Sequence, residues 1–346
     1  MKAAIFEPDK GIKVAERAKP EVGEGEVRVR VGRCGVCMTD VHITKGGFSV
    51  SEPVVLGHEF SGVVDELGPG VDWLDTGDRV AANPIISCGR CSYCRDGRTN
   101  FCKNAIVLGG AGDNIIDGGF QEYSVVPHKN LGKFDKSTSF EEAAFAEPLA
   151  CAIRGVKRLK VNVSDEVLLI GAGPMGLLLL QLLTRQGISK IFVSEPMEER
   201  RQLASEFGAD FLLNPEESNV PEAVKELSEN GDGVDIAAEA VGSKATTKTA
   251  MRALRRGGKA LVFGVPPEEA EVSVNIFDTY YDEVDLIGSY ALTEQDFSDS
   301  ISLIRNEQLE LNRLVSHKFN LDDLKEAIEM TATGGGLKKQ IKFDQI

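Results

Sequence analysis

Four of the seven cysteines crowd into one short stretch of the chain, at Cys88, Cys91, Cys94 and Cys102. Gaps of two residues let consecutive thiolates reach one ion from a tight turn, and a seven-residue loop returns the fourth. Four thiolates without an open coordination position are typical of a closed structural zinc site. Scattered core or redox cysteines would not crowd at this spacing. A zinc-based interaction module carries the same pattern, so this cluster alone does not establish catalysis.

A second set of metal-ligating side chains is spread over three segments, around Cys37, at His58 and Glu59, and at Glu147. Taken singly, His58 could be an ordinary turn residue and Cys37 an ordinary core residue. Two of the four histidines of the chain, His42 and His58, nevertheless fall in this region. Thiolate, imidazole and carboxylate, with water or substrate in an open position, are the donor set of a catalytic zinc. This set predicts a metal centre that does chemistry.

An apolar run at 167–170 is followed by a glycine-rich turn and a Leu-rich segment, which predicts a strand, a turn and a helix. The turn reads Gly171-Ala172-Gly173-Pro174-Met175-Gly176. Gly173 lets the backbone approach a pyrophosphate, Gly176 lets the helix pack close to the strand, and the helix N-terminus offers N–H groups to phosphates. The carboxylate of Glu195, about twenty residues on, accepts hydrogen bonds from ribose hydroxyls and repels a 2′-phosphate. The pattern predicts NAD rather than NADP, a preference that nearby Arg200 and Arg201 would soften.

The composition is that of a globular protein with room for two domains, since the chain has 346 residues, 42% of them hydrophobic and 27% charged. No apolar run approaches the length of a membrane span, and the first ten residues lack the features of an export signal. The net charge of −15 disfavours nucleic acid and anionic membranes as partners. We therefore expect a cytoplasmic protein whose cysteines bind metal rather than form disulfides.

The order of predicted elements divides the chain into two kinds of structure. Residues 1–80 predict short strands separated by turns, at 2–6, 26–31, 63–67 and 79–82, and a helix is expected at 145–158. Six strands (167–170, 190–194, 210–213, 234–238, 259–263, 284–288) then alternate with helices (174–187, 197–207, 219–229, 244–256). That rhythm is typical of a doubly wound parallel sheet. Helices at 294–306 and 321–332 and a strand at 340–343 return the chain to the β-rich part.

Three further motifs complete a pattern that extends over the whole chain: Gly35-Val36-Cys37-Met38-Thr39-Asp40-Val41-His42, Gly57-His58-Glu59-Phe60-Ser61-Gly62 and Gly77-Asp78-Arg79-Val80. With the four cysteines and the glycine turn, they resemble the zinc-dependent medium-chain dehydrogenase/reductase family of alcohol, polyol, sugar and threonine dehydrogenases. The resemblance implies an α/β protein with a discontinuous, β-rich GroES-like catalytic domain, residues 1–147 and 290–346, and a Rossmann NAD-binding domain, residues 148–289. It also implies two zinc ions per chain, one catalytic and one structural, and a homo-oligomer, a tetramer rather than a dimer, joined through about residues 258–288.

The resemblance also assigns roles residue by residue. Cys37 and His58 hold the catalytic zinc. Glu59 is a ligand or moves in when substrate exchanges, and Glu147 is either a ligand or hydrogen-bonded to the zinc-bound water. Thr39 and His42 pass the substrate proton to solvent. The residues expected at the cofactor are Gly171, Gly173, Pro174, Met175, Gly176, Glu195, Arg200, Phe263, Ser289 and, near the pyrophosphate, Lys338. Phe48 and Tyr290 are expected to face the substrate.

The implied reaction is hydride transfer from a secondary alcohol, a polyol or sugar alcohol, to NAD, giving a ketone. Glu147 and the Gly-His-Glu motif favour a polyol or threonine over ethanol-type alcohols. Sorbitol itself is disfavoured, because the segment Gly288-Ser289-Tyr290 lacks the Arg-Tyr pair that sorbitol dehydrogenases usually carry there. A glucose-type aldose 1-dehydrogenase and an L-threonine 3-dehydrogenase are the alternative enzymes. A non-catalytic zinc-binding member is an alternative from another class, but such a chain should have lost ligands or glycines that this one retains.

Overall fold

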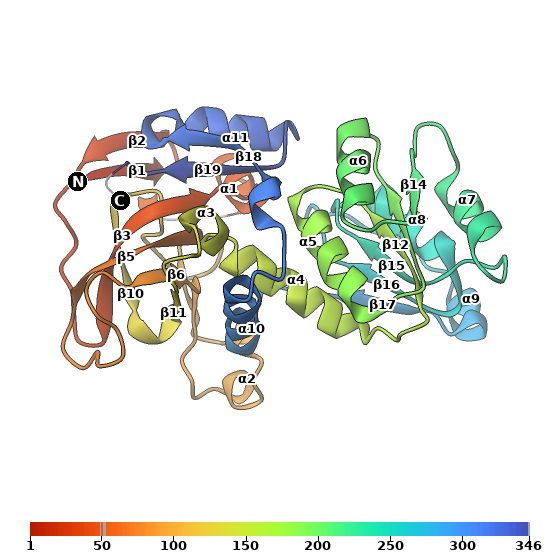
Figure 1. The fold of residues 1–346 in the computed structure, drawn as a ribbon, viewed down its shortest axis with the longest axis horizontal. Helices are drawn as coiled ribbons and strands as arrows, with labels where there is room; N and C mark the ends of the chain where they lie inside the picture. Colours follow the sequence, from red (N-terminus) through yellow and green to blue (C-terminus); the bar gives the residue numbers. More distant parts are fainter. Residues whose placement is uncertain (49, 51–52, 345–346) are drawn as a thin grey trace. The chain divides into compact units, whose positions relative to one another are not determined.

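The structure, a computed structural model, describes residues 1–48, 50 and 53–344 and divides the chain into two compact units. Unit 1 comprises residues 1–150 and 292–346, and unit 2 comprises residues 151–291. The sequence placed these boundaries at 147/148 and 289/290. The first lies three residues before the observed one, within the same helix, and the second lies two residues before the observed one, in the loop that follows residue 288. Residues 345–346 lie outside the described part. Unit 1 is therefore discontinuous, and Figure 1 shows its blue C-terminal segment among the red and orange N-terminal strands.

Unit 2 is built on one parallel sheet whose six strands are flanked by helices (Figure 1). The strands are β12 (Glu166–Ile170), β13 (Lys190–Ser194), β14 (Phe211–Leu213), β15 (Val234–Glu239), β16 (Leu254–Val262) and β17 (Asp285–Gly288). Their spatial order is β14-β13-β12-β15-β16-β17, so the strand order reverses between β12 and β15. In an open parallel sheet, ligands bind beyond the carboxyl ends of the strands at such a reversal.

All helices of unit 2 except α9 begin and end close to the predicted residues. The helices of this unit are the greater part of α4 (Ala146–Leu159), α5 (Pro174–Leu183), α6 (Glu198–Glu206), α7 (Val220–Leu227), α8 (Lys244–Ala253) and the short α9 (Ile276–Asp282). The sequence missed α9, and it predicted β16 five residues too late, because its first residues include two arginines and two glycines rather than an apolar run. Strand β12 is buried along its whole length, as expected for a central parallel strand covered on both faces.

The largest sheet of unit 1 has seven strands drawn from both ends of the chain. They are β3 (Glu26–Gly35), β5 (Glu59–Leu67), β6 (Arg79–Ala82), β10 (Tyr123–Pro127), β11 (Leu131–Phe134), β18 (Val315–Asn320) and β19 (Lys338–Lys342). Strand β19 pairs with β3, with Gln340 opposite Gly35, so the C-terminal segment completes a sheet begun by the N-terminal one. The sequence missed β18 because this edge strand is polar and largely exposed, without the alternation that marks a half-buried strand.

Two smaller sheets and several short helices complete unit 1. One sheet joins β1 (Lys2–Glu7), β2 (Gly11–Glu16) and β4 (Val54–Val55), and the other joins β7 (Ile85–Ile86), β8 (Ile106–Leu108) and β9 (Ile115–Ile116). The helices are α1 (Met38–Thr44), α2 (Ser92–Arg95), α3 (Phe140–Ala143), α10 (Glu294–Arg305) and α11 (Leu324–Ala332).

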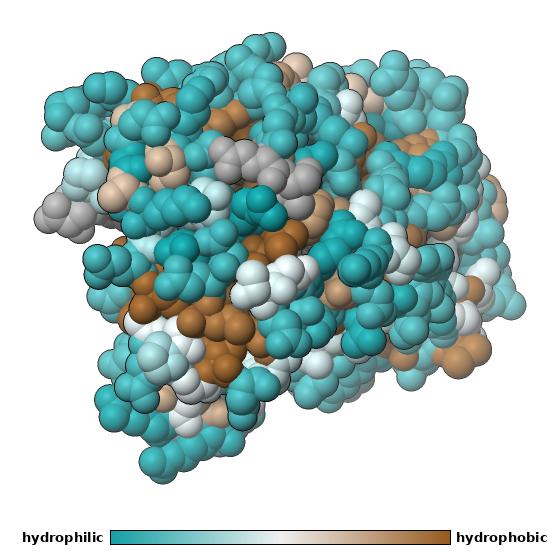
Figure 2. Space-filling model, turned by 60° about the vertical axis from the view of Figure 1, so that its left-hand side comes forward, coloured by the Kyte–Doolittle hydropathy of each residue, from teal (hydrophilic) through white to brown (hydrophobic). Residues whose placement is uncertain are grey.

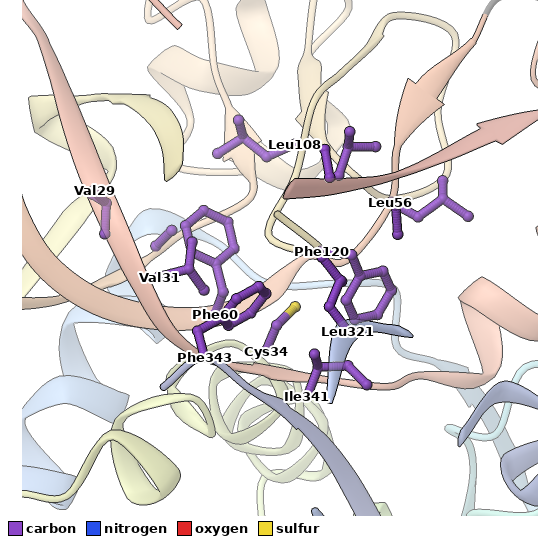
Figure 3. Packing of buried hydrophobic residues seen from close by; sticks show 14 of the residues in the cluster. Val29, Val31, Cys34, Leu56, Phe60, Leu108, Phe120, Leu321, Ile341 and Phe343 are labelled. Carbon is purple, nitrogen blue, oxygen red and sulfur yellow. The ribbon is translucent and has the colours of Figure 1, made fainter. Parts of the chain in front are cut away.

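The core of unit 1 brings residues from both ends of the chain into contact. Figure 3 shows Val31, Cys34 and Phe60 from β3 and β5 packed near Ile341 and Phe343 from the C-terminal strand and its end. All five side chains are buried. At roughly 25 cal/mol for each Å² of apolar surface removed from water, such contacts are the main reason that the C-terminal segment stays on this sheet.

The molecular surface is largely hydrophilic on the face drawn in Figure 2, with hydrophobic side chains in separate patches. Among the described residues, no helix combines the length and the apolar character needed to cross a membrane.

Candidate active site

The four clustered cysteines converge as their spacing predicts. The sulfur atoms of Cys88, Cys91, Cys94 and Cys102 all lie within 4.8 Å of one another. The cluster surrounds the single turn of α2, with Cys91 directly before it and Cys94 within it, and their sulfur atoms are 3.5 Å apart. Hydrogen bonds from the backbone N–H groups of Arg90 and Cys91 lower the pKa of the Cys88 thiol to about 6. Four crowded sulfurs, at least one readily ionised, fit one zinc ion with no open position.

The second cluster assembles from segments that are distant in the sequence. Cys37 is the N-cap of α1, two residues after the end of β3, whereas Glu59 is the first residue of β5 and His58 precedes it. Pairing of β3 with β5 sets Gly35 opposite Glu59, and this register brings the two segments together. One ligand atom from each of Cys37, His58 and Glu59 lies within 4.8 Å of the other two. Sulfur, nitrogen and oxygen donors at these separations fit a zinc ion that keeps an open position.

The backbone at Gly35 makes room for the Glu59 carboxylate. A Cβ atom at this position would lie 2.0 Å from Glu59 Oε2, well inside any real contact distance. Glycine at position 35 of the Gly-Val-Cys motif therefore serves the packing of the metal site as well as the strand.

His58 is buried close to several acidic groups. Burial lowers its pKa, but the hydrogen bond to Cys37 and the charges of Cys37, Asp40 and Glu147 outweigh burial and raise the pKa well above its ordinary value. His58 Nδ1 lies 3.8 Å from Asp40 Oδ1, and neither atom has a hydrogen-bond partner among the described residues. Asp40 Oδ2 accepts the backbone N–H of Cys37 at 2.8 Å. A metal ion at this cluster would place a cation where the protein has gathered negative charge, and Asp40 would steady its imidazole ligand.

Lys338 is the counter-ion of Glu59. Its ammonium donates to both carboxylate oxygens at 2.8 Å and to the carbonyl oxygen of Val36 at 3.3 Å, and both side chains are buried. Burial lowers the pKa of Lys338, whereas the charges of Glu59 and Cys37 raise it, with a net rise. The sequence assigned Lys338 to the pyrophosphate of the cofactor, but the structure gives its ammonium to Glu59, within unit 1. Sequence inspection missed this pair because its members are 279 positions apart.

Glu147 lies in the first turn of α4, outside the group of three ligands. Its charge still acts on this centre, because it contributes to the raised pKa of both His58 and Lys338. The structure therefore places the four expected ligands in one region but groups only Cys37, His58 and Glu59 closely enough to share an ion.

Thr39 and His42 lie three residues apart on α1, so they share one face of that helix. The Thr39 hydroxyl accepts a hydrogen bond from Cys37 Sγ, the two atoms being 3.6 Å apart. The ring of His42 meets the ring of Phe48 edge to face, with centroids 5.4 Å apart. Phe48 also packs against the core of unit 1. The Thr39 hydroxyl beside the Cys37 sulfur and the His42 imidazole one turn further along the helix are two groups that can each accept and donate a proton.

The glycine turn of unit 2 has the space that a pyrophosphate needs. A Cβ at Gly173 would meet only the end of Arg200, at 3.9 Å from Nη1, so the front of the turn is open. A Cβ at Gly176 would lie 2.0 Å from the carbonyl oxygen of Gly171, so this position excludes any side chain. Helix α5 begins at Pro174, and no side chain caps its N-terminus. Its first N–H groups are therefore left for an anionic ligand.

Glu195 lies at the carboxyl end of β13, beside the turn, and is buried. Its Oε2 accepts the N–H of Ala172 at 2.8 Å and its Oε1 accepts the N–H of Met197 at 3.1 Å. Each carboxylate oxygen keeps a further lone pair for a ribose hydroxyl. Arg201, in contrast, donates to the carbonyl oxygens of Glu195 and Pro196, so its guanidinium is engaged by the backbone.

The remaining residues expected at the cofactor or substrate lie in unit 2. Phe263 packs against α4, since a Cβ at Gly155 would be 3.0 Å from its ring. Ser289 follows β17, and its hydroxyl is buried without a hydrogen-bond partner among the described residues. Tyr290 is exposed.

Unit 1 also contains a hollow of about 730 Å³ near the segment that follows the four cysteines. It is lined by Val50, Pro53, Val54, Asn104, Ile106, Gly112, Asp113, Asn114, Ile115 and Ile116. The loop that forms one wall also reaches the metal cluster, because a Cβ at Gly110 would contact both Val107 and His58. None of these lining residues carries a positive charge, whereas Asp113 carries a negative one.

A thiolate–imidazole–carboxylate cluster, a separate four-thiolate site and a dinucleotide turn at the strand reversal together define a zinc-dependent dehydrogenase. The donor sets fit the metal, and the open glycine turn fits the cofactor.

Comparison with known proteins agrees with this class. The model of the alcohol dehydrogenase GroES-like domain matches residues 23–136, and that of the zinc-binding dehydrogenase domain matches residues 174–306. The chain is 31% identical to sorbitol dehydrogenase of Halalkalibacterium halodurans and 32% identical to L-threonine 3-dehydrogenase of Pyrococcus horikoshii, over 94% of each chain in both cases. A zinc-binding dehydrogenase of Sinorhizobium meliloti 1021, solved with NADP bound, superposes with a TM-score of 0.92 at 33% identity, over 99% of both chains.

The chain belongs to the zinc-dependent medium-chain dehydrogenase family. It is an oxidoreductase of the alcohol and polyol dehydrogenase type, with zinc and a nicotinamide dinucleotide as its cofactors. The predicted family, two-domain α/β fold, enzyme class and cofactors are thereby confirmed.

Proposed function

We propose that this enzyme oxidises a secondary hydroxyl of a polyol or sugar alcohol to a ketone, with NAD as the hydride acceptor. The observation that carries the proposal is the convergence of Cys37, His58 and Glu59, whose ligand atoms lie within 4.8 Å of one another. Zinc at this cluster would supply the positive charge that stabilises a deprotonated substrate oxygen, and NAD would accept the hydride.

The protein residues supply binding and proton transfer. Cys37 and His58 would hold the metal. Glu59, whose carboxylate accepts hydrogen bonds from Lys338, would bind it directly or when substrate exchanges, and Glu147 adds negative charge nearby. Thr39, next to the Cys37 sulfur, would accept the proton of the substrate hydroxyl, and His42 would pass it towards solvent. A hydroxyl and an imidazole are suitable groups for such a relay near neutral pH.

The preference for NAD over NADP would rest on Glu195, because a buried carboxylate beside the adenosine ribose repels a 2′-phosphate. The Sinorhizobium relative was solved with NADP, so this choice needs its own test. We expect Glu195→Ala to reduce the NAD preference, measured as the ratio of kcat/KM for the two cofactors, by about tenfold or more, the value of one lost charge-assisted contact. Equal use of NAD and NADP by the unmodified enzyme would show that Glu195 does not decide the cofactor.

The choice of a polyol follows Glu147 and the Gly-His-Glu motif, which the family resemblance associates with polyol and threonine dehydrogenases rather than with ethanol-type enzymes. L-Threonine is the second candidate, since a relative with that activity is 32% identical.

A substrate panel tests the proposal. The zinc-loaded enzyme should reduce NAD with polyols and should not do so with glucose or L-threonine. Growth of reduced nicotinamide with glucose or threonine and none with polyols would overturn the assignment. A protein that binds zinc but oxidises nothing in the panel would favour the non-catalytic alternative.

A second copy of the chain is the proposed protein partner. Strand β17 is an edge of the unit 2 sheet, and α9 precedes it with Ile276 84% exposed and Tyr280 80% exposed, beside exposed Phe277 and Tyr281. An exposed strand edge next to aromatic side chains is typical of a surface that another chain covers. We expect a tetramer or a dimer that Phe277→Lys with Tyr280→Lys converts to smaller species in light scattering. A monomeric wild-type enzyme would refute it.

The protein is also proposed to work in the cytoplasm without nucleic acid or membrane as partners, because its net charge is −15 and its seven cysteines suit a reducing compartment. Cell fractionation with an antibody against the chain would test the location.

A further inference from the structure

Glu239 lies at the point in unit 2 where the order of strands reverses. It is the last residue of β15, paired in register with Ile170 at the end of β12 and with Val262 at the end of β16. Ile170 directly precedes the glycine turn, so Glu239 belongs to the same carboxyl edge of the sheet as the expected dinucleotide site. The family resemblance gave this residue no role.

Its side chain and backbone connect three segments of that edge. Oε1 accepts hydrogen bonds from the N–H groups of Val241 and Gly242, at 2.7 and 2.8 Å, and from the Thr246 hydroxyl at 2.9 Å. The carbonyl oxygen of Glu239 accepts the N–H groups of Phe263 and Gly264, at 3.0 and 2.9 Å. Glu239 thus ties the turn after β15 to the first turn of α8 and to the loop after β16.

The turn held by Glu239 packs against the glycine turn. Val241 Cγ2 lies 2.7 Å from the place of a Cβ at Gly171, so no side chain fits between them. The same turn also touches the loop after β16, because a Cβ at Gly242 would be 2.5 Å from the carbonyl oxygen of Val265. Val241 and Val265 are nevertheless 53% and 54% exposed. Val241 beside the glycine turn and Val265 beside Gly242 thus expose apolar side chains at this edge of the sheet, where a flat, bound ligand would cover them.

The carboxylate itself is fully buried, and its Oε2 has no hydrogen-bond partner among the described residues. Leaving a buried carboxylate oxygen without a partner is costly, so such an atom in a folded protein calls for a functional explanation. Since Oε1 already has three donors, the carboxylate cannot turn to satisfy Oε2 without releasing the turn that it holds.

We propose that Glu239 is a positioning residue of the dinucleotide site. Its carboxylate fixes the turn 240–242 so that Val241 and Val265 present their apolar surface beside the glycine turn. This inference rests on the proposed use of a nicotinamide dinucleotide. Glu239 does not take part in the hydride transfer. It fixes the conformation of the turn against which the cofactor would bind.

The test compares NADH binding, measured by the fluorescence of the reduced nicotinamide, in the wild type and two variants at position 239. Glu239→Ala removes the acceptor of three hydrogen bonds and should raise the dissociation constant of NADH by more than about tenfold. Glu239→Gln retains an acceptor oxygen and should stay within about threefold of the wild type. Thr246→Val removes one of the three donors and should weaken binding by roughly threefold, which keeps the test decisive if the alanine variant does not fold.

Glu166 offers a matched control at the opposite edge of the same sheet. It is the first residue of β12, is buried, pairs with Lys190 at 3.0 Å and accepts the N–H of Glu229. Glu166→Gln should lower the melting temperature but leave the NADH dissociation constant unchanged. Wild-type affinity in Glu239→Ala, or equal weakening in Glu166→Gln, would overturn the inference. A wild-type protein that binds no NADH would instead refute the proposed function.

Discussion

The two metal clusters of unit 1 are built in opposite ways. The four-cysteine site takes all its ligands from fifteen consecutive residues around one helical turn, and its cysteines are only partly buried. The proposed catalytic cluster takes Cys37, His58 and Glu59 from two segments that β-pairing brings together, and it lies beside the buried Asp40 and Lys338. A site that only fastens a loop needs the right local spacing. A site that does chemistry also needs an environment that controls the charge of its ligands, and only the assembled fold supplies that.

The largest expected effect is the loss of the Cys37 thiolate. Cys37→Ser should lower kcat/KM by about a thousandfold, because metal stabilisation of charge in the transition state is worth several kcal/mol. Metal analysis should show zinc falling from two ions per chain to one, with the four-cysteine site still filled. Full turnover in a variant that has lost one zinc would refute the metal role of this cluster.

Removing a ligand from the local site should instead destabilise the protein. Cys91→Ala should lower the free energy of unfolding by more than about 3 kcal/mol, since loss of a structural metal belongs among the largest single-residue effects. Chains that remain folded should keep the catalytic ion and near-normal kcat per bound catalytic zinc. A variant with wild-type stability and lost turnover would reverse the roles of the two clusters.

Asp40 tests whether the charged surroundings of the catalytic cluster control its metal affinity. Asp40→Asn keeps the shape of the side chain but removes the charge that faces His58 at 3.8 Å. The affinity for the catalytic metal should fall by about 10- to 100-fold, measured by competition with a chelator, while the structural zinc is retained. Equal loss of both ions would indicate general unfolding instead.

The smallest effect concerns the sheet that carries the catalytic ligands. Glu141 pairs with Arg33 of β3 and Lys318 of β18, at 2.8 and 3.0 Å. Burial raises the pKa of Glu141, but the hydrogen bond from Lys318 and the charge of Arg33 outweigh burial, so the net pKa is lowered. A lowered pKa stabilises the fold above the unfolded value of about 4.3, and this stabilisation is lost as the pH falls through the folded value.

Glu141→Gln should therefore be about 1 kcal/mol less stable than the wild type at neutral pH, and the difference should vanish in acid, below the lowered pKa. Chemical denaturation at several pH values measures it. A constant difference down to the acid limit would show that the charge of Glu141 is not responsible. The spectrum of cobalt bound at the four-cysteine site should be the same in Glu141→Gln and in the wild type, since that site does not depend on the sheet.

Much of the fold follows from patterns that are visible in the sequence. The helices from α5 to α8 and five of the six strands of unit 2 begin within one or two residues of their predicted starts, because apolar runs and glycines mark them. The polar edge strand β18 and the short, exposed α9 carry no such signal. Asp40 had a visible signal, its position three residues after Cys37 at the start of a helix, but its place 3.8 Å from His58 is visible only in the folded chain.

The sequence by itself determined the class of chemistry, because thiol, imidazole and carboxylate groups and the glycine turn are recognised by type and short-range spacing. Only the tertiary structure decided which charges face one another. It paired Lys338 with Glu59 across 279 positions and left one oxygen of Glu239 without a partner among the described residues at the strand reversal. Long-range pairing depends on strand register and burial, and these are properties of the folded chain that no local stretch of sequence contains.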